Sequence, residues 1–146
     1  MIAQTIQLAL APVFVLVAIG NIMNLLSTRL GRVVDRSRAL QGRYRETTGD
    51  EHDMVVREMR VVDRRIRLVG AALRLLVTSG LAIGLTVALL FLEDVLRYDL
   101  QRFAAATFIA AVGLLMWALV LILRETQAAS AALRIPEAYL ERERRL

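Results

Sequence analysis

Three apolar segments constrain this chain more than any other feature of its sequence. They cover about residues 6–26, 68–92 and 103–123, and charged segments separate them. Each has roughly the 20 residues that a helix needs to cross the hydrocarbon core of a bilayer. None alternates between apolar and polar residues as a barrel strand does, and leucine and alanine dominate all three. The sequence therefore predicts an all-α membrane protein with three transmembrane helices.

Arginine supplies all 19 basic residues, and its distribution predicts the orientation in the membrane. The connection between the first two apolar segments holds eleven arginines, whereas the connection between the second and third holds two. Because arginine accumulates on the cytosolic side, we expect the amino terminus outside and the carboxyl-terminal tail, 124–146, in the cytosol. The first segment lacks the marks of a cleaved signal peptide, so we expect it to remain as a membrane helix.

The long connection, residues 29–67, is predicted to be helical. Apolar residues recur at helical spacing on both sides of a breaker at residues 46–50, as in the seam of a coiled coil. Gly49 suits a turn, and Asp50 suits the N-cap of the next helix. We therefore expect the first two transmembrane helices to extend into a cytosolic antiparallel helical hairpin, within a single membrane domain, 1–146. The predicted seams comprise Leu26, Leu30, Val33, Leu40 and Tyr44, and then Val55, Met59, Val62, Ile66, Val69 and Leu73.

A dense charged block begins where the first apolar segment ends, and three interpretations of it remain open. Its arginines can anchor the helix at anionic lipid headgroups, each contributing about 1 kcal/mol near the surface. They can instead form salt bridges across the hairpin, or line the vestibule of a ligand or ion path. A tip near Thr48 would place Asp35 opposite Arg60 to Arg64, and Asp63 opposite Arg32. The predicted charged network comprises Arg29, Arg32, Asp35, Arg36, Arg38, Arg60, Asp63 and Arg64.

Three polar side chains lie inside the apolar segments near their cytosolic ends: Asn21, Asn24 and Arg74. The hairpin places Arg74 level with both asparagines. Because an unpaired charge at this depth is costly, Arg74 either extends to the headgroups or joins the asparagines in a polar cluster at the mouth of a pore. 

Gly80 and Gly84 form a GxxxG pattern in the second apolar segment. Such small residues allow close helix packing, either within the chain or between copies of it.

The remaining residues give little sign of chemistry. The chain has no cysteine, and its single histidine, His52, has no metal-ligating partner at a useful spacing. It also lacks a nucleophile–base pair, a glycine-rich phosphate loop and paired carboxylates within the apolar segments. We therefore expect no catalytic residue, no metal, no cofactor and no enzymatic activity. The net charge of +5 follows from the arginine bias of a membrane protein, so we expect no nucleic-acid partner.

Several local patterns together resemble a known family. The first apolar segment contains Ala11-Pro12-Val13-Phe14 and Asn24-Leu25-Leu26, and the pattern Arg-x-x-Arg-x-x-Asp-Arg-x-Arg follows from Arg29 to Arg38. The pair Arg64-Arg65 leads into the second segment. Over most of residues 6–92, and weakly over the third segment, the chain resembles the bacterial DUF2721 family of uncharacterised membrane proteins. The resemblance implies a location in the bacterial inner (plasma) membrane, and it supplies no catalytic residues.

Two classes of function follow from these predictions. Three thin helices bury little surface among themselves, so we expect a homo-oligomer. Such an assembly could conduct ions through a pore with a cationic cytosolic mouth. Alternatively, the chain could be a membrane scaffold or adaptor that transports nothing and docks a cytosolic protein partner through its hairpin.

Overall fold

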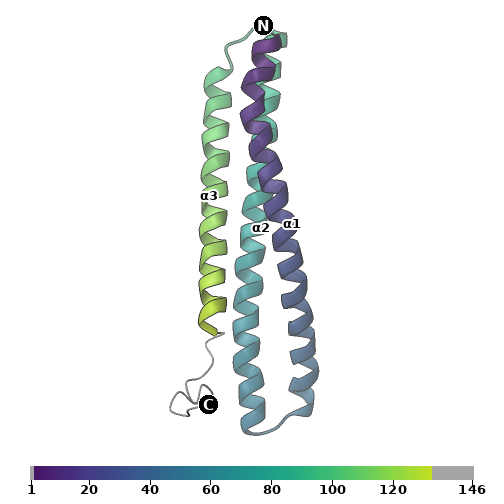
Figure 1. Cartoon of the computed structure of the whole chain (residues 1–146). Helices are drawn as coiled ribbons and strands as arrows, with labels where there is room; N and C mark the ends of the chain where they lie inside the picture. Colours follow the sequence, from purple (N-terminus) through teal and green to yellow (C-terminus); the bar gives the residue numbers. More distant parts are fainter. Residues whose placement is uncertain (1, 133–146) are drawn as a thin grey trace, which may run out of the picture.

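The structure, a computed structural model, describes residues 2–132, with side chains from residue 3 to residue 127. It contains three helices: α1 (Ile2–Glu46), α2 (Asp50–Leu96) and α3 (Gln101–Ala132). All three are long and apolar enough to cross a membrane, which confirms the predicted fold class. Figure 1 shows the amino terminus and the α2–α3 connection at one end, and the α1–α2 turn at the other. The predicted tail is helical as far as Ala132, and the rest of it lies outside the described residues.

The first two helices form one long antiparallel hairpin. They have 45 and 47 residues, so each is about 70 Å long at 1.5 Å per residue. The turn between them depends on Gly49, whose φ of 69° side chains rarely adopt. The prediction for Asp50 was wrong in one detail, because Gly49 is the N-cap of α2 and Asp50 is its first residue. The carboxylates of Asp50, Glu51 and Asp53 then lie in the first turn, where the helix dipole favours negative charge.

Buried side chains recur every seven residues along both helices of the hairpin. This spacing keeps one stripe of each helix against the other over their whole length. The predicted seams are confirmed by the buried residues from Leu26 to Leu40 and from Val55 to Val69, and the pattern continues beyond them to Ile19 and Ile83. Tyr44, by contrast, is exposed, and its ring centroid lies 4.5 Å from that of His52 with the rings tilted at 45°. The buried residues are Ile19, Leu26, Val33 and Leu40 on α1, and Val55, Val62, Val69, Leu76 and Ile83 on α2.

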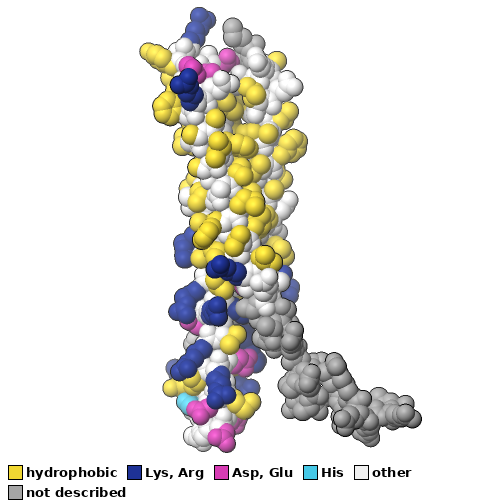
Figure 2. Space-filling model, turned by 90° about the vertical axis from the view of Figure 1, so that its left-hand side faces the viewer, with side chains coloured by type: hydrophobic (Ala, Val, Ile, Leu, Met, Phe, Trp, Pro, Cys, Tyr) yellow, Lys and Arg dark blue, Asp and Glu magenta, His cyan; other side chains and the backbone are white. Residues whose placement is uncertain are grey.

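The hairpin divides into an apolar part and a charged part, shown in Figure 2. We call residues 30–64 the stalk, because around them the surface is rich in arginine, aspartate and glutamate. Val33, Leu40, Val55 and Val62 form the core of the stalk. A separate core, which includes Ile19, Leu76 and Ala111, joins all three helices in the apolar part.

The central helix is α2, because α1 and α3 each pack along it. Small side chains bring α3 close: Ala104, Ala111 and Ala118 are buried. The hydroxyl of Ser79 donates a hydrogen bond to the carbonyl oxygen of Ala111 at 2.7 Å. The hydroxyls of Thr86 and Thr107 are 2.8 Å apart and form a second hydrogen bond between the helices. These hydrogen bonds help to hold α3 against α2. In an apolar environment they matter because the hydrophobic effect contributes little to the association of helices there.

Candidate functional site

A buried carboxylate joins the three helices at the base of the stalk. Glu125 of α3 has a side chain that is 3% exposed. The Nε and Nη2 atoms of Arg65 donate to its Oε1 at 3.0 and 2.9 Å. Nη1 of Arg29 donates to its Oε2 at 3.4 Å, so α1 and α2 each contribute one arginine. We call Arg29, Arg65 and Glu125 the clamp.

The heptad spacing of the two helices positions the clamp. Glu125 follows Ala104, Ala111 and Ala118 by the same step of seven residues, so it lies on the face of α3 that contacts α2. On α2, Arg65 precedes the buried residues Ala72, Ser79 and Thr86 by the same step. The Ser79–Ala111 hydrogen bond fixes the antiparallel register, and this register brings residue 65 opposite residue 125. The clamp is therefore one more layer of the α2–α3 interface.

The clamp contains two guanidinium groups and one carboxylate. A buried carboxylate without a partner would lower the free energy of unfolding by several kcal/mol. The ion pairs with Arg65 and Arg29 offset this penalty for Glu125. The arginine side chains remain 34% and 43% exposed. The cluster thus retains one excess positive charge that faces its surroundings. Its chemistry fits a structural connection between helices and attraction of anionic headgroups.

Sequence reasoning assigned Glu125 to the charged tail and did not include it, or Arg65, in the charged network. The sequence contains one signal for Glu125. It follows Ala104, Ala111 and Ala118 at intervals of seven residues, so it lies on the same face of α3 as these alanines, against α2.

The predicted polar cluster does not form within the described chain. Asn21, Asn24 and Arg74 are all exposed, and among the described residues no hydrogen bond or ion pair joins their side chains. Nη1 of Arg74 would lie 3.7 Å from a Cβ placed on Gly70, one turn nearer the stalk. The guanidinium therefore extends along α2 toward the arginine-rich end, as a snorkelling side chain does.

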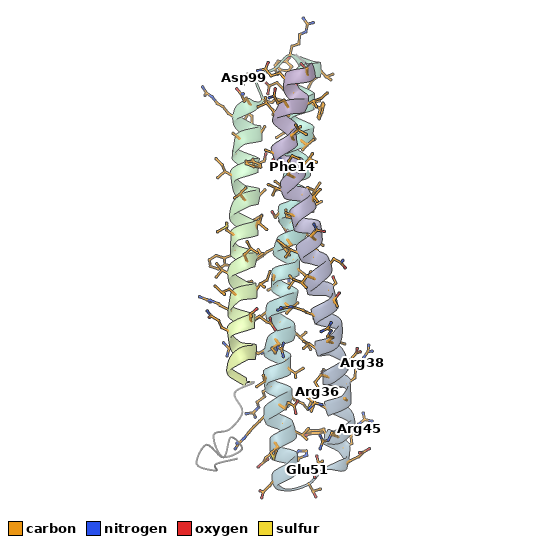
Figure 3. The ribbon with its side chains drawn as sticks, viewed as in Figure 1. Phe14, Arg36, Arg38, Arg45, Glu51 and Asp99 are labelled. Atoms are coloured by element: carbon orange, nitrogen blue, oxygen red, sulfur yellow. The ribbon has the colours of Figure 1, made fainter. Side chains whose placement is uncertain are left out.

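The predicted charge pairs across the hairpin do not form, because these side chains are turned away from the opposite helix. Asp35 lies 4.0 Å from Arg38 on its own helix, and Asp63 lies 2.8 Å from Arg67 on its own helix. The pairs that cross the stalk are instead Arg36–Glu58 at 2.6 Å and Arg43–Glu51 at 3.1 Å. In Figure 3, Arg36 and Glu51 lie along the stalk, one on each helix. Within the described residues Arg32, Arg60 and Arg64 have no ion-pair partner.

The two glycines of the GxxxG pattern have different surroundings. A Cβ on Gly80 would lie 3.6 Å from Leu16 and 3.9 Å from Ile19, so Gly80 allows close approach of α1. A Cβ on Gly84 would meet nothing within 4 Å, and this residue is exposed. Only Gly80 therefore serves packing within the chain.

A second polar region lies at the opposite end of the molecule, near Asp99 in Figure 3. An open hollow of about 810 Å³ separates the start of α1 from the end of α2. No group of three or more histidine, cysteine or acidic side chains that could hold a metal occurs in the described part of the chain. The hollow is lined by Gln4, Thr5, Leu8, Leu90, Glu93, Asp94, Arg97, Tyr98, Asp99 and Gln101.

Comparison with known protein families gives a match to a family described as "Protein of unknown function (DUF2721)". The match covers residues 9–135, which include most of α1, all of α2 and α3, and the clamp. The comparison with curated proteins found no match, and neither did the comparison with solved structures.

Proposed function

The chain belongs to the DUF2721 family, and we propose that it is a self-associating membrane scaffold whose stalk docks a protein partner. The observation that carries this proposal is the shape of the stalk. Both of its helices continue past the level of Ala132, the last described residue of α3, as a two-helix rod with its own core (Figure 1). The 35 residues of the stalk, 30–64, would be superfluous in a protein that acted only within the bilayer, and a projecting rod suits contact with another protein.

The side of the stalk that would receive the partner is marked by exposed apolar side chains. Met54 and Val61 are exposed and are seven residues apart, so they lie on one face of α2. Neither contributes to the core of the stalk. Exposed apolar patches rimmed by polar residues mark protein–protein contact sites, and we infer that Met54 and Val61 belong to such a patch.

The orientation follows from the arginine bias. We propose that the stalk and the clamp face the cytosol and that the amino terminus faces outward, in a bacterial inner membrane. In this orientation the excess charge of the clamp lies beside anionic headgroups.

The docking role can be tested with a photo-crosslinking amino acid in intact membranes. Substitution at Met54 or Val61 should give adducts with a second protein, larger than the chain and its multimers. Asp53 provides a matched control, because it is exposed on the same helix but turned about 100° away from Met54. Absence of adducts from both Met54 and Val61 would contradict the docking role, as would equal yield from Asp53.

A pore formed by several copies is the second candidate. It is favoured by one observation, the exposure of Asn21, Asn24 and Arg74 on the apolar part of the hairpin. Copies arranged around an axis could direct these side chains toward a shared path. The test is ion flux in liposomes that contain the purified protein. Flux of neither anions nor cations above that of empty liposomes would exclude this candidate.

A further inference from the structure

We propose that copies of this chain associate head to tail, with the outer face of α1 in one copy against the outer face of α2 in the next. This inference rests on the proposed self-association and specifies its interface. The outer face of α1 is defined by Phe14, Asn21, Asn24 and Asp35, and the outer face of α2 by Arg60, Arg64, Arg74 and Leu81.

The two outer faces point in opposite directions within one copy. Asn21 follows the buried Ile19 by two positions, and Arg74 precedes the buried Leu76 by two positions. A step of two residues turns a side chain by about 200° around a helix, away from the α1–α2 seam. A single copy therefore cannot join these faces, whereas two neighbouring copies in the same membrane orientation can.

The polar side chains of the two faces need partners. The side chains of Asn21, Asn24 and Arg74 are exposed and make no hydrogen bond within the described residues. Water does not satisfy the two amides inside a bilayer, and polar side chains there hydrogen-bond to neighbouring helices. The amide oxygens of the asparagines accept hydrogen bonds, and the guanidinium of Arg74 donates them. The faces are therefore chemically complementary.

These groups also lie at one depth. The approach of Gly80 to Leu16 and Ile19 fixes the register of the hairpin. Six residues nearer the stalk, Arg74 lies level with Asn21 and Asn24. A neighbouring copy held at the same depth by the same membrane thus brings its Arg74 to the height of these asparagines.

The match continues above and below the polar groups. Phe14 is 69% exposed and Leu81 is 71% exposed, and they lie at the same level on opposite faces. In the stalk, Asp35 has only its 4.0 Å contact with Arg38, while Arg60 and Arg64 have no ion-pair partner in the described chain. The head-to-tail arrangement supplies Asp35 with the arginines that it does not reach in its own copy.

One contact opposes the arrangement, because Arg38 of one copy would approach Arg57 of the next. Both side chains are exposed on the stalk, where water and salt screen their repulsion. 

A symmetric pairing of α1 with α1 is the main alternative. It would join asparagine to asparagine and leave Arg74 and the arginines of the stalk unmatched. The head-to-tail contact uses both faces of every copy and closes into a ring when the rotation between copies permits.

Disulfide formation between copies tests the interface directly, because the chain has no cysteine of its own. Two differently tagged copies are expressed together, one with Phe14→Cys and the other with Leu81→Cys. We expect a disulfide between the two tags. Ile109→Cys serves as the matched control, because Ile109 of α3 is also 71% exposed and the Ser79–Ala111 contact places it level with Leu81. It should form no disulfide with Phe14→Cys.

Removal of the polar contacts gives a second readout. Arg74→Leu should lower the disulfide yield between Phe14→Cys and Leu81→Cys by about threefold to twentyfold, the range for hydrogen bonds between membrane helices. The same change should leave the helical content of each copy unaltered, because the side chain of Arg74 has no partner among the described residues of its own copy.

Three outcomes would overturn the proposal in distinguishable ways. A disulfide between two Phe14→Cys copies in place of the mixed pair would show symmetric pairing. Copurification of the two tags without the mixed disulfide would show self-association through another face. No copurification would refute self-association itself, while the adducts from Met54 and Val61 would still report on docking by the stalk.

Discussion

Substitution of Arg65 by leucine should lower the free energy of unfolding by most of what the clamp contributes to it. The change leaves the buried carboxylate of Glu125 with only Arg29, whose Nη1 is 3.4 Å away. Loss of one partner from a buried ion pair typically costs about 3–5 kcal/mol. The 34% exposure of Arg65 lets water reach the site, so we expect the lower end, about 3 kcal/mol.

Glu125→Gln should lower the free energy of unfolding less, by about 1–2 kcal/mol. The amide oxygen of the glutamine still accepts a hydrogen bond from Arg65, and water can hydrate the arginines that lose their charged partner. The double variant Arg65→Leu/Glu125→Leu should recover most of the loss, since apolar pairs of similar volume often replace buried ion pairs without cost. Arg29→Leu, with a longer contact and 43% exposure, should cost less than about 1 kcal/mol.

The assay is unfolding of the purified protein in mixed micelles with increasing sodium dodecyl sulfate, followed by circular dichroism. Single and double variants together give a double-mutant cycle for Arg65 and Glu125. We expect a coupling energy of at least about 1.5 kcal/mol, the value for a hydrogen bond to a charged group. A coupling below about 0.5 kcal/mol, or a larger loss from Arg29→Leu than from Arg65→Leu, would refute the clamp.

Three further predictions concern the rest of the molecule. Ser79→Ala should weaken α3 packing by about 0.6–1.7 kcal/mol in the same unfolding assay, because it removes the bond to the carbonyl of Ala111, and an unchanged transition would contradict that bond. Leu40→Ala should cost about 2–5 kcal/mol and speed hydrogen exchange across the stalk, whereas Arg36→Ala, which breaks an exposed pair, should cost less than about 1 kcal/mol; equal effects would contradict the core of the stalk. In intact cells an impermeant thiol reagent should label Tyr98→Cys but reach Thr48→Cys only after lysis, and the reverse pattern would overturn the proposed orientation.

The elements of the fold were predictable because each has a strong local cause. Apolar segments of bilayer length specify the helices, and the break at residues 46–50 contains the one glycine that adopts a positive φ. The seam of the stalk followed from helical spacing alone, and Val55, Val62 and Leu40 are buried as that spacing requires.

The charge pairs were not predictable from the turn alone, because an error of one residue rotates a side chain by about 100°. The prediction aligned Asp35 with the arginines of α2 by their height along the hairpin. The burial of Val33 decides the rotation, and it turns Asp35 away from α2 while Arg36 reaches Glu58. Height and rotation must both be known before two charges can be paired.

The two seams of α2 differ in composition, and the difference follows the helix that each seam contacts. Ala72, Ser79 and Thr86 face α3 in the apolar part, where helices associate through small residues and hydrogen bonds. The seam that faces α1 keeps large apolar residues along its whole length, from Val55 and Val62 in the stalk to Leu76 and Ile83 in the apolar part. The two neighbours of α2 are therefore held differently, α1 by interlocking aliphatic side chains and α3 by close backbone approach and hydrogen bonds. The clamp extends the α3 seam by one step of seven residues to the charged end of the molecule, where the arginines are partly exposed and the carboxylate is not. A glutamate held by two arginines thus connects α3 to both helices of the hairpin at the level where the small-residue seam ends.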